Sequence, residues 1–202
     1  MGQRISEGLH RVSTGRVALA ATVIFLLFSA LVLPRQATAD KRYPSAEAGA
    51  GDVGSPDTSL YYSRDELYRM AEAYGAQGRA AYVRARLTFD VIWPVVYTLF
   101  LSTAISWLYA RAFEPGSSWR RANLAPVLGA LFDYLENLST SLVMLRYPDH
   151  TPVVDALAPI FTLIKWIFVG GSFALLFIGL AVGVYRLRRP HSVDASKQSR
   201  TE

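Results

Sequence analysis

The apolar residues of this chain are gathered into four long runs and do not recur with the period of a single amphipathic helix or strand. Residues 17–33 contain no charged side chain, residues 87–110 and 157–185 contain one each, and residues 124–145 contain two. A helix needs about 20 apolar residues to cross the hydrocarbon core of a bilayer. The pattern therefore predicts an all-α, polytopic membrane protein that folds as a four-helix bundle.

The segment between the first two runs begins as a polar stretch. Residues 34–62 include PSAEAGAGDVGSPDTS, which is small, polar and rich in Gly and Pro. Such a composition buries too little apolar surface to offset the entropy of ordering the chain. We therefore expect residues 34–62 to form a flexible linker on the outer side of the membrane.

A short helix is predicted directly after this linker. Ser63 followed by Glu66 matches a capping box, and apolar side chains recur at helical spacing behind it. We expect an amphipathic helix over residues 63–75 that lies on the outer surface and is broken near Gly75 and Gly78.

The basic residues at the ends of the runs predict the orientation. Lys and Arg favour the cytoplasmic side of a membrane, most clearly in short segments. Basic side chains precede the first run, join the second to the third and follow the fourth: Arg4, Arg11, Arg16, Arg111, Arg120, Arg121, Arg186, Arg188 and Arg189. We therefore expect the N-terminal residues 1–16 and the tail at residues 187–202 to be cytoplasmic, with the chain in a bacterial cell membrane.

The first run has two interpretations. Basic residues precede residues 17–33 and an ATA cleavage pattern follows, so residues 1–39 have features of a signal peptide. The run is longer than the roughly 7–15 apolar residues of a signal peptide, and Arg35 lies between it and the cleavage pattern. We favour residues 17–33 as a retained transmembrane helix, and the orientation of the rest is the same in either case.

Polar side chains lie on one face of the third run. Asp133, Glu136, Asn137 and Thr140 have the spacing i, i+3, i+4 and i+7, which puts them on one side of a helix. An ionisable side chain in a spanning helix costs about 2.5–3.5 kcal/mol on insertion scales, so it almost always faces the protein interior and finds a partner. The pattern predicts a polar core in a three-helix region at residues 79–186.

The other two helices of this region supply the expected partners. Lys165 on the fourth run and Asp90 with Tyr97 on the second lie at overlapping depths in the outer half of the membrane. Three carboxyl groups then face one ammonium group. We therefore expect that at least one carboxyl is protonated, that a cation binds, or that an Arg turns inward. The candidates for that inward turn are Arg79, Arg84 and Arg86.

The composition excludes several kinds of site. The chain has no cysteine, which rules out a disulfide, a thiolate metal site and a cysteine nucleophile. His10, His150 and His191 lie outside the runs, so we expect no zinc site and no bound metal or cofactor. The net charge of +5 comes from basic residues at the run ends, without a patch of interleaved aromatics, so we expect no nucleic-acid partner.

Four short motifs in the second half of the chain suggest a resemblance. These are GRAAY ahead of the second run, FDVIWPVVY at its start, FDYLEN in the third run and TLIKW in the fourth. Together they resemble a group of uncharacterised bacterial integral membrane proteins with four predicted helices, over residues 60–168. The resemblance implies a membrane location and the same polar positions, and it implies no particular activity.

The polar core has both functional and structural interpretations. We favour an outward-opening intramembrane pocket that binds a small or amphiphilic ligand or relays protons. The expected ligand-binding residues are Asp90, Tyr97, Asp133, Glu136, Asn137 and Lys165. The first alternative is a membrane-embedded enzyme that acts on a lipid, with Asp133 or Glu136 as general acid or base. The second is a structural or assembly subunit whose polar residues only join helices.

Overall fold

The computed structural model describes residues 2–35 and 54–188, and within these residues the chain is helical with short connections and no strand. The elements in chain order are α1 (Gly2–Val12), α2 (Gly15–Leu31), η1 (Pro56–Thr58), α4 (Arg64–Ala112), η2 (Ser118–Leu124), α5 (Ala125–Arg146) and α6 (Val154–Arg188). The predicted all-α class is therefore confirmed for the described part of the chain.

Three of the described helices are long and apolar enough to cross a membrane. They are α2, which continues as a helix to Arg35, then α4 and α6. These helices contain the predicted runs at residues 17–33, 87–110 and 157–185. The remaining predicted run, the third in chain order at residues 124–145, forms the 22-residue helix α5. This helix is not among the three, because polar side chains along its buried face lower its apolar content.

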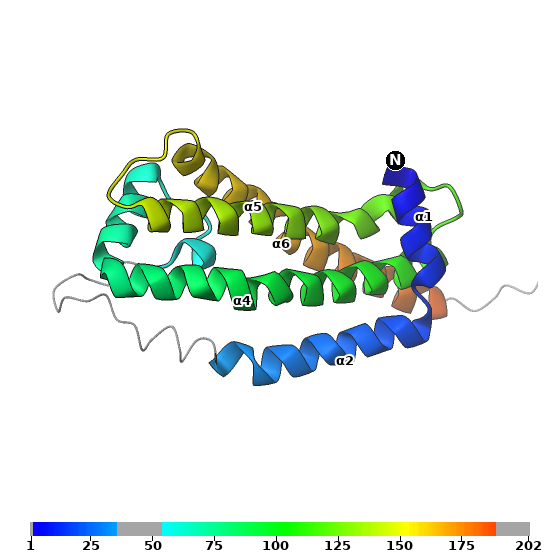
Figure 1. Ribbon diagram of the computed structural model, residues 1–202. Helices are drawn as coiled ribbons and strands as arrows, with labels where there is room; N and C mark the ends of the chain where they lie inside the picture. Colours follow the sequence, from blue (N-terminus) through cyan, green and yellow to red (C-terminus); the bar gives the residue numbers. More distant parts are fainter. Residues whose placement is uncertain (1, 36–53, 189–202) are drawn as a thin grey trace, which may run out of the picture.

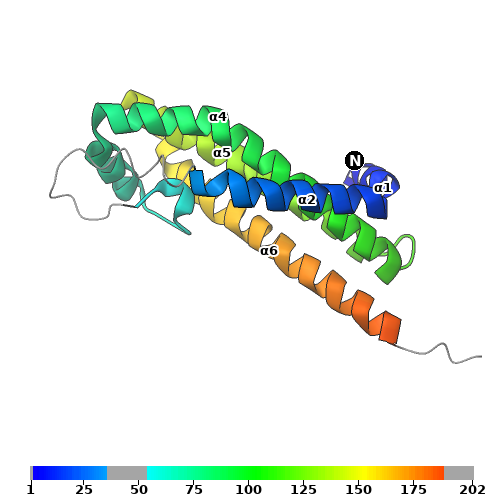
Figure 2. The same cartoon turned by 90° about the horizontal axis from the view of Figure 1, so that it is seen from below.

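Helices α4, α5 and α6 pack against one another, and α2 lies along α4 (Figures 1 and 2). Figure 1 shows α2 on the side of α4 that faces away from α5. Aromatic rings join the two helices: Phe25 stacks on Phe100 with ring centroids 4.5 Å apart, and Phe28 stacks on Trp93 at 5.7 Å. The core is therefore a three-helix unit to which α2 adds an outer layer.

The N-terminal residues form a helix that the sequence analysis did not predict. Helix α1 crosses one end of the bundle (Figure 1). Its Ser6 hydroxyl donates to the side chain of Asn123 at 2.8 Å, and the Asn123 amide donates to Ser106 at 2.9 Å. The ring nitrogens of His10 lie 3.1 Å and 2.9 Å from the carbonyl oxygens of Ser106 and Arg120. These contacts fix α1 against α4 and η2.

The predicted capping box is present at the start of α4. Ser63 Oγ accepts from the Glu66 backbone N–H at 3.2 Å, and Glu66 Oε2 accepts from the Ser63 backbone N–H at 2.7 Å. The helix is interrupted at Gly75, whose φ of 59° and ψ of 179° lie outside the helical region. The predicted break is confirmed there, and Gly78 remains helical. The short first part of α4 folds across the end of the bundle (Figure 1).

The predicted flexible linker at residues 34–62 is wrong for its described residues. Residues 34 and 35 continue the helix of α2, and residues 54–62 contain η1 and lie against α6, where the Trp166 indole donates to the carbonyl of Ser59 at 2.9 Å. Tyr62 is only 2% exposed. Local composition did not reveal this order, because the ordering contacts come from distant helices. The middle of the predicted linker, residues 36–53, lies outside the described residues.

Candidate functional site

The polar face of α5 points into the three-helix core, as its spacing predicts. Asp133 and Asn137 are 8% and 6% exposed, and Glu136 and Thr140 are fully buried. The Thr140 hydroxyl donates back to the Glu136 carbonyl at 2.9 Å, and the hydroxyl of Tyr82 on α4 donates to Thr140 at 3.1 Å. Tertiary packing therefore surrounds this face with partners from the neighbouring helices.

Glu136 and Lys165 form a buried ion pair between α5 and α6. Thr162, one turn before Lys165, donates its hydroxyl to Glu136 Oε1 at 2.8 Å. The hydroxyl of Tyr62 lies 3.1 Å from the Thr162 hydroxyl, so the chain just ahead of α4 reaches the same cluster. Lys165 also donates to the carbonyl oxygen of Asp57 at 3.4 Å. The predicted Lys165 partner on α5 is therefore Glu136, and both charges have further polar contacts.

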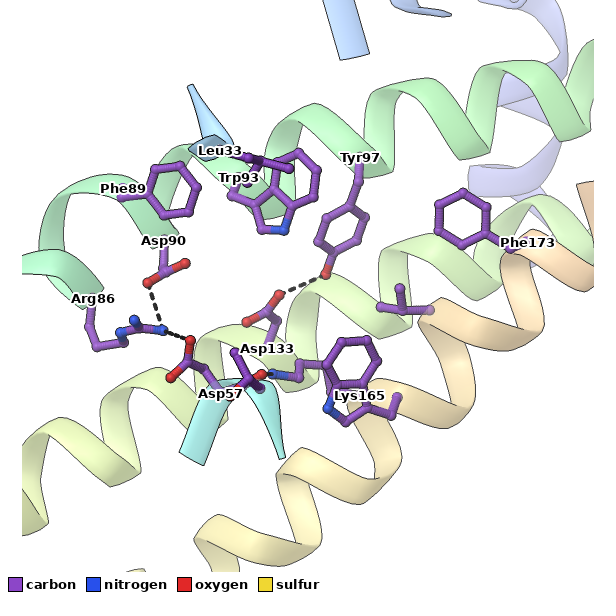
Figure 3. Close-up of a pocket in the computed structure, with 13 residues that line it drawn as sticks. Leu33, Asp57, Arg86, Phe89, Asp90, Trp93, Tyr97, Asp133, Lys165 and Phe173 are labelled. Carbon is purple, nitrogen blue, oxygen red and sulfur yellow. Dashed lines mark hydrogen bonds and ion pairs between the residues drawn. The ribbon is translucent and has the colours of Figure 1, made fainter. Parts of the chain in front are cut away.

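Asp133 has only neutral partners. The Tyr97 hydroxyl donates to Asp133 Oδ2 at 3.0 Å, and the Asn137 amide donates to Oδ1 at 3.1 Å. Among the described residues, no Lys or Arg nitrogen lies within 4.0 Å of this carboxyl group. Figure 3 shows the Asp133 carboxyl group directed at the Tyr97 hydroxyl. One buried carboxyl group therefore lies in the core without a Lys or Arg of the described residues in ion-pair contact.

Arg86 provides the second cation of the site. It is 6% exposed, and its Nη1 lies 2.8 Å from Asp90 Oδ2 and 3.0 Å from Asp57 Oδ2. Its guanidinium also stacks over the Tyr82 ring, 4.7 Å from the centroid. The sequence analysis expected that one of three Arg residues could turn inward, and Arg86 is the one that does. Asp90 therefore pairs with an Arg of its own helix.

Asp57 is the site residue that sequence reasoning missed. It lies in η1, within the stretch interpreted as a linker, and Figure 3 shows it between Arg86 and the end of Lys165. Burial alone would raise the pKa of the Asp57 carboxyl, but the Arg86 guanidinium, with help from the Ser55 hydroxyl and Lys165, holds the pKa below its ordinary value. A charged residue within a Gly- and Pro-rich stretch is a weak signal, because such residues are usually solvated.

A cavity of about 490 Å³ lies beside these polar groups. Its lining comes from the end of α2, from η1, α4, α5 and α6: Leu33, Asp57, Thr58, Arg86, Phe89, Asp90, Trp93, Tyr97, Asp133, Lys165, Trp166, Val169 and Phe173. Figure 3 shows the charged groups close together and the aromatic rings beside them. The volume is within the range of about 300–1,000 Å³ that is usual for small-molecule sites.

The six predicted site residues divide into two layers. Asp90, Tyr97, Asp133 and Lys165 line the cavity. Glu136 and Asn137 are not among its lining residues, and they hold the lining residues in place: Glu136 pairs with Lys165, and Asn137 donates to Asp133. The structure thus brings all six into one cluster. Comparison of the chain with protein-family models, curated proteins and solved structures gave no match.

Proposed function

We propose that this chain is an integral membrane protein whose polar cavity binds a small or amphiphilic ligand. The observation that carries the proposal is the composition of the cavity, which places Asp133, Asp90 and Lys165 on the same lining as Trp93 and Phe173. A purely structural polar network in lipid needs only to pair its own groups. A cavity with charged and apolar walls also suits a ligand that has a polar head and an apolar chain.

We further propose that α5 is a fourth spanning helix. The predicted resemblance to four-helix bacterial membrane proteins agrees with this proposal. The outer face of α5 carries Leu131, Leu138 and Leu145 at intervals of seven residues, and these side chains are 50%, 61% and 66% exposed. Large side chains so exposed on one helix face are costly in water and suit contact with acyl chains. At about 1.5 Å of rise per residue, α5 is about 33 Å long, which matches the hydrocarbon core.

The position of the basic residues supports an orientation in which residues 1–16 and the C-terminal tail are cytoplasmic. The membrane that we propose is a bacterial cell membrane, as the resemblance implies. The basic segments near α1, η2 and the end of α6 then share one side. The cavity lies toward the other end of the bundle, near η1, which is the outer end in this orientation. We therefore propose that the ligand enters from the outer half of the bilayer, beside the end of α2.

Proton relay and lipid chemistry are further uses of the same groups. Of the two catalytic candidates, Asp133 suits general acid or base chemistry better, because it lines the cavity and has no cation. Glu136 is fully buried and already paired with Lys165. An enzyme would therefore use Asp133, and the ligand-binding proposal needs no reaction at all.

The proposal is tested by labelling the cavity with a photoreactive alkyl chain. The purified protein in nanodiscs is irradiated with a diazirine-bearing amphiphile, and the labelled peptides are mapped by mass spectrometry. We expect saturable labelling on peptides that contain the lining segments of α4 and α6. Leu33→Trp places a larger side chain on the lining of the cavity and should reduce this labelling several-fold. The matched control is Leu27→Trp on the same helix, where the side chain is 54% exposed and outside the lining.

Two results would contradict the proposal. Labelling that increases linearly with probe concentration would mean that only bulk lipid contact is detected. Equal effects of the substitutions at Leu33 and Leu27 would mean that the cavity takes no part in the labelling.

A further inference from the structure

We infer that the cavity selects an amphiphile whose polar head is a positively charged ammonium group. The inference rests on the ligand-binding function proposed above and specifies which head group the cavity accepts. It follows from three features of the described residues: the balance of charge, the position of Asp133 and the aromatic side chains next to it.

The charges around the cavity do not balance. Asp57 and Asp90 share the single guanidinium of Arg86, and Glu136 takes the ammonium of Lys165. Asp133 adds a further carboxyl group without a cation. When all four carboxyl groups are ionised, two negative charges have no counterpart among the described Lys and Arg residues of the cluster. An anionic head group would add to this excess, whereas an ammonium group reduces it.

Asp133 is the point at which a cation completes the site. It lines the cavity and is 8% exposed, so it is largely shielded from water. Each of its oxygens accepts one hydrogen bond from a neutral donor, Tyr97 or Asn137. A carboxylate oxygen accepts more than one hydrogen bond, so both oxygens retain capacity for a further donor or cation. Charge-assisted contacts to an ionised carboxylate are stronger than contacts between neutral groups.

Aromatic rings form the wall beside this carboxylate. Phe89, Trp93 and Tyr97 line the cavity from successive turns of α4, and the rings of Trp93 and Tyr97 meet edge to face with centroids 5.8 Å apart. The face of an aromatic ring attracts an ammonium cation, and Trp attracts it best. Two ring faces are already covered: Lys165 lies over Trp166 at 5.1 Å, and Phe28 stacks on one face of Trp93 at 5.7 Å, so an ammonium group would meet the rest of this wall. An aromatic wall with a carboxylate is a suitable environment for alkylammonium.

The remainder of the lining suits the chain of such a ligand. Leu33, Val169 and Phe173 belong to the same lining and carry no polar side-chain atom. An alkyl chain in contact with these side chains would be stabilised by each CH₂ group that leaves water. The ligand class is therefore an alkylammonium amphiphile. It is either a free long-chain amine or the ammonium-bearing head group of a bilayer phospholipid.

The test compares head groups on one chain. Three probes share an undecyl chain with a terminal bromine and differ only in the head, which is trimethylammonium, hydroxyl or carboxylate. Bromine quenches tryptophan on contact, and the cavity is lined by Trp93 and Trp166. In nanodiscs of phosphatidylglycerol, which has no ammonium group, the concentration of each probe is taken as the amount that partitions into the bilayer, since this anionic lipid attracts the cationic probe and repels the carboxylate probe. On this scale we expect saturable quenching by the trimethylammonium probe. The other two probes should bind about tenfold more weakly, as expected for a difference of one or two kcal/mol.

A variant tests whether Asp133 is responsible. Asp133→Asn should lower the affinity for the trimethylammonium probe about tenfold and leave the hydroxyl probe unchanged. Asp149→Asn, the same substitution in the exposed loop before α6, is the matched control and should change neither. If Asp133→Asn fails to fold, the head-group series on the unaltered chain still tests the inference. Nanodiscs of phosphatidylcholine then separate the two ligand sources, because competition from the host lipid indicates a phospholipid head group.

The outcomes separate the two proposals. Absence of saturable quenching by any probe would overturn the ligand-binding function itself. Saturable quenching of equal strength for all three heads would leave the cavity as a binding site and overturn the head-group inference. Stronger binding of the carboxylate probe would overturn it as well.

Discussion

At the scale of single residues, the site depends on which cation each carboxyl group obtains. Lys165 pairs with Glu136, and Arg86 pairs with Asp57 and Asp90. The hydrogen-bond donors to Asp133 are both neutral. Removal of one partner from a buried ion pair costs several kcal/mol, because the remaining charge has no partner. The paired acids thus stabilise the cations, and Asp133 remains available for another group.

Asp57 should make the attachment of residues 54–62 sensitive to acid. Because Arg86 and its other partners hold its pKa below the ordinary value of 3.8, the folded chain resists protonation more than the unfolded chain. The stabilisation is therefore present above about pH 4 and is lost as the pH falls through the lowered pKa. The fluorescence of Trp166, whose indole donates to Ser59, is expected to change over this acidic range.

The variant Asp57→Asn should remove this acid-dependent change, because the amide has no proton to gain. Asp65→Asn, an exposed acid in the first turn of α4, serves as the control and should retain it. An unaltered titration of Trp166 fluorescence in Asp57→Asn would show that another group governs the attachment.

At the scale of elements, α4 has two parts that meet at Gly75 and have different roles. Its first part begins at the capping box and folds across the end of the bundle, and the rest supplies Arg86, Asp90 and Tyr97 to the site. The break is needed because one straight helix of 49 residues could not serve both positions. Only glycine adopts a φ of 59° with a ψ of 179° without strain, since it has no Cβ atom.

Gly75→Ala should therefore lower the free energy of unfolding by about 1–3 kcal/mol, the cost of a residue held in a disfavoured backbone region. The matched control is Gly170→Ala, a glycine of α6 around which an added Cβ would meet open space. Alanine is a better helix former than glycine there, so the control should be neutral or stabilising by up to about 1 kcal/mol. Chemical unfolding in detergent, followed by circular dichroism, measures both. Equal effects would show that the Gly75 conformation is unimportant.

At the scale of the whole molecule, the helices differ in how much they expose to their surroundings. α2 presents Leu19, Leu26 and Leu27 with 54–66% of each side chain exposed, and it packs mainly along α4. The outer faces of α4, α5 and α6 also carry exposed apolar residues, while their shared interior holds the charged cluster. This arrangement, apolar outside and polar inside, suits a bundle surrounded by lipid.

The proposed topology predicts that η2 and the loop between α5 and α6 lie on opposite sides of the membrane. The chain has no native cysteine, so a single introduced thiol can be labelled without background. In intact cells, a membrane-impermeant maleimide should label Asp149→Cys, whereas Ser118→Cys should react only after permeabilisation. Both positions are exposed. Labelling of both from the same side would mean that α5 does not cross the membrane.

The sequence by itself determined the helical class, the positions of the long apolar runs within the helices and the inward face of α5. The first two follow from the length of the apolar runs. The third follows from the helical spacing of the polar residues, because a charged side chain cannot face lipid without a large cost. The same reasoning identified the capping box at Ser63 and the break at Gly75, where the signal lies within a few residues. It also selected the six residues that the fold brings into one cluster.

The tertiary structure alone decided how the charges are shared. Arg86 points inward and pairs with Asp57, and Lys165 pairs with Glu136 and not with Asp133. These pairings depend on the relative rotation and approach of elements far apart in the sequence. Residues 54–62 and α1 are ordered by partners more than a hundred residues away, such as Trp166 and Asn123. Such partners cannot be predicted from local composition, because an ion pair or a buried hydrogen bond forms only after packing brings both groups together.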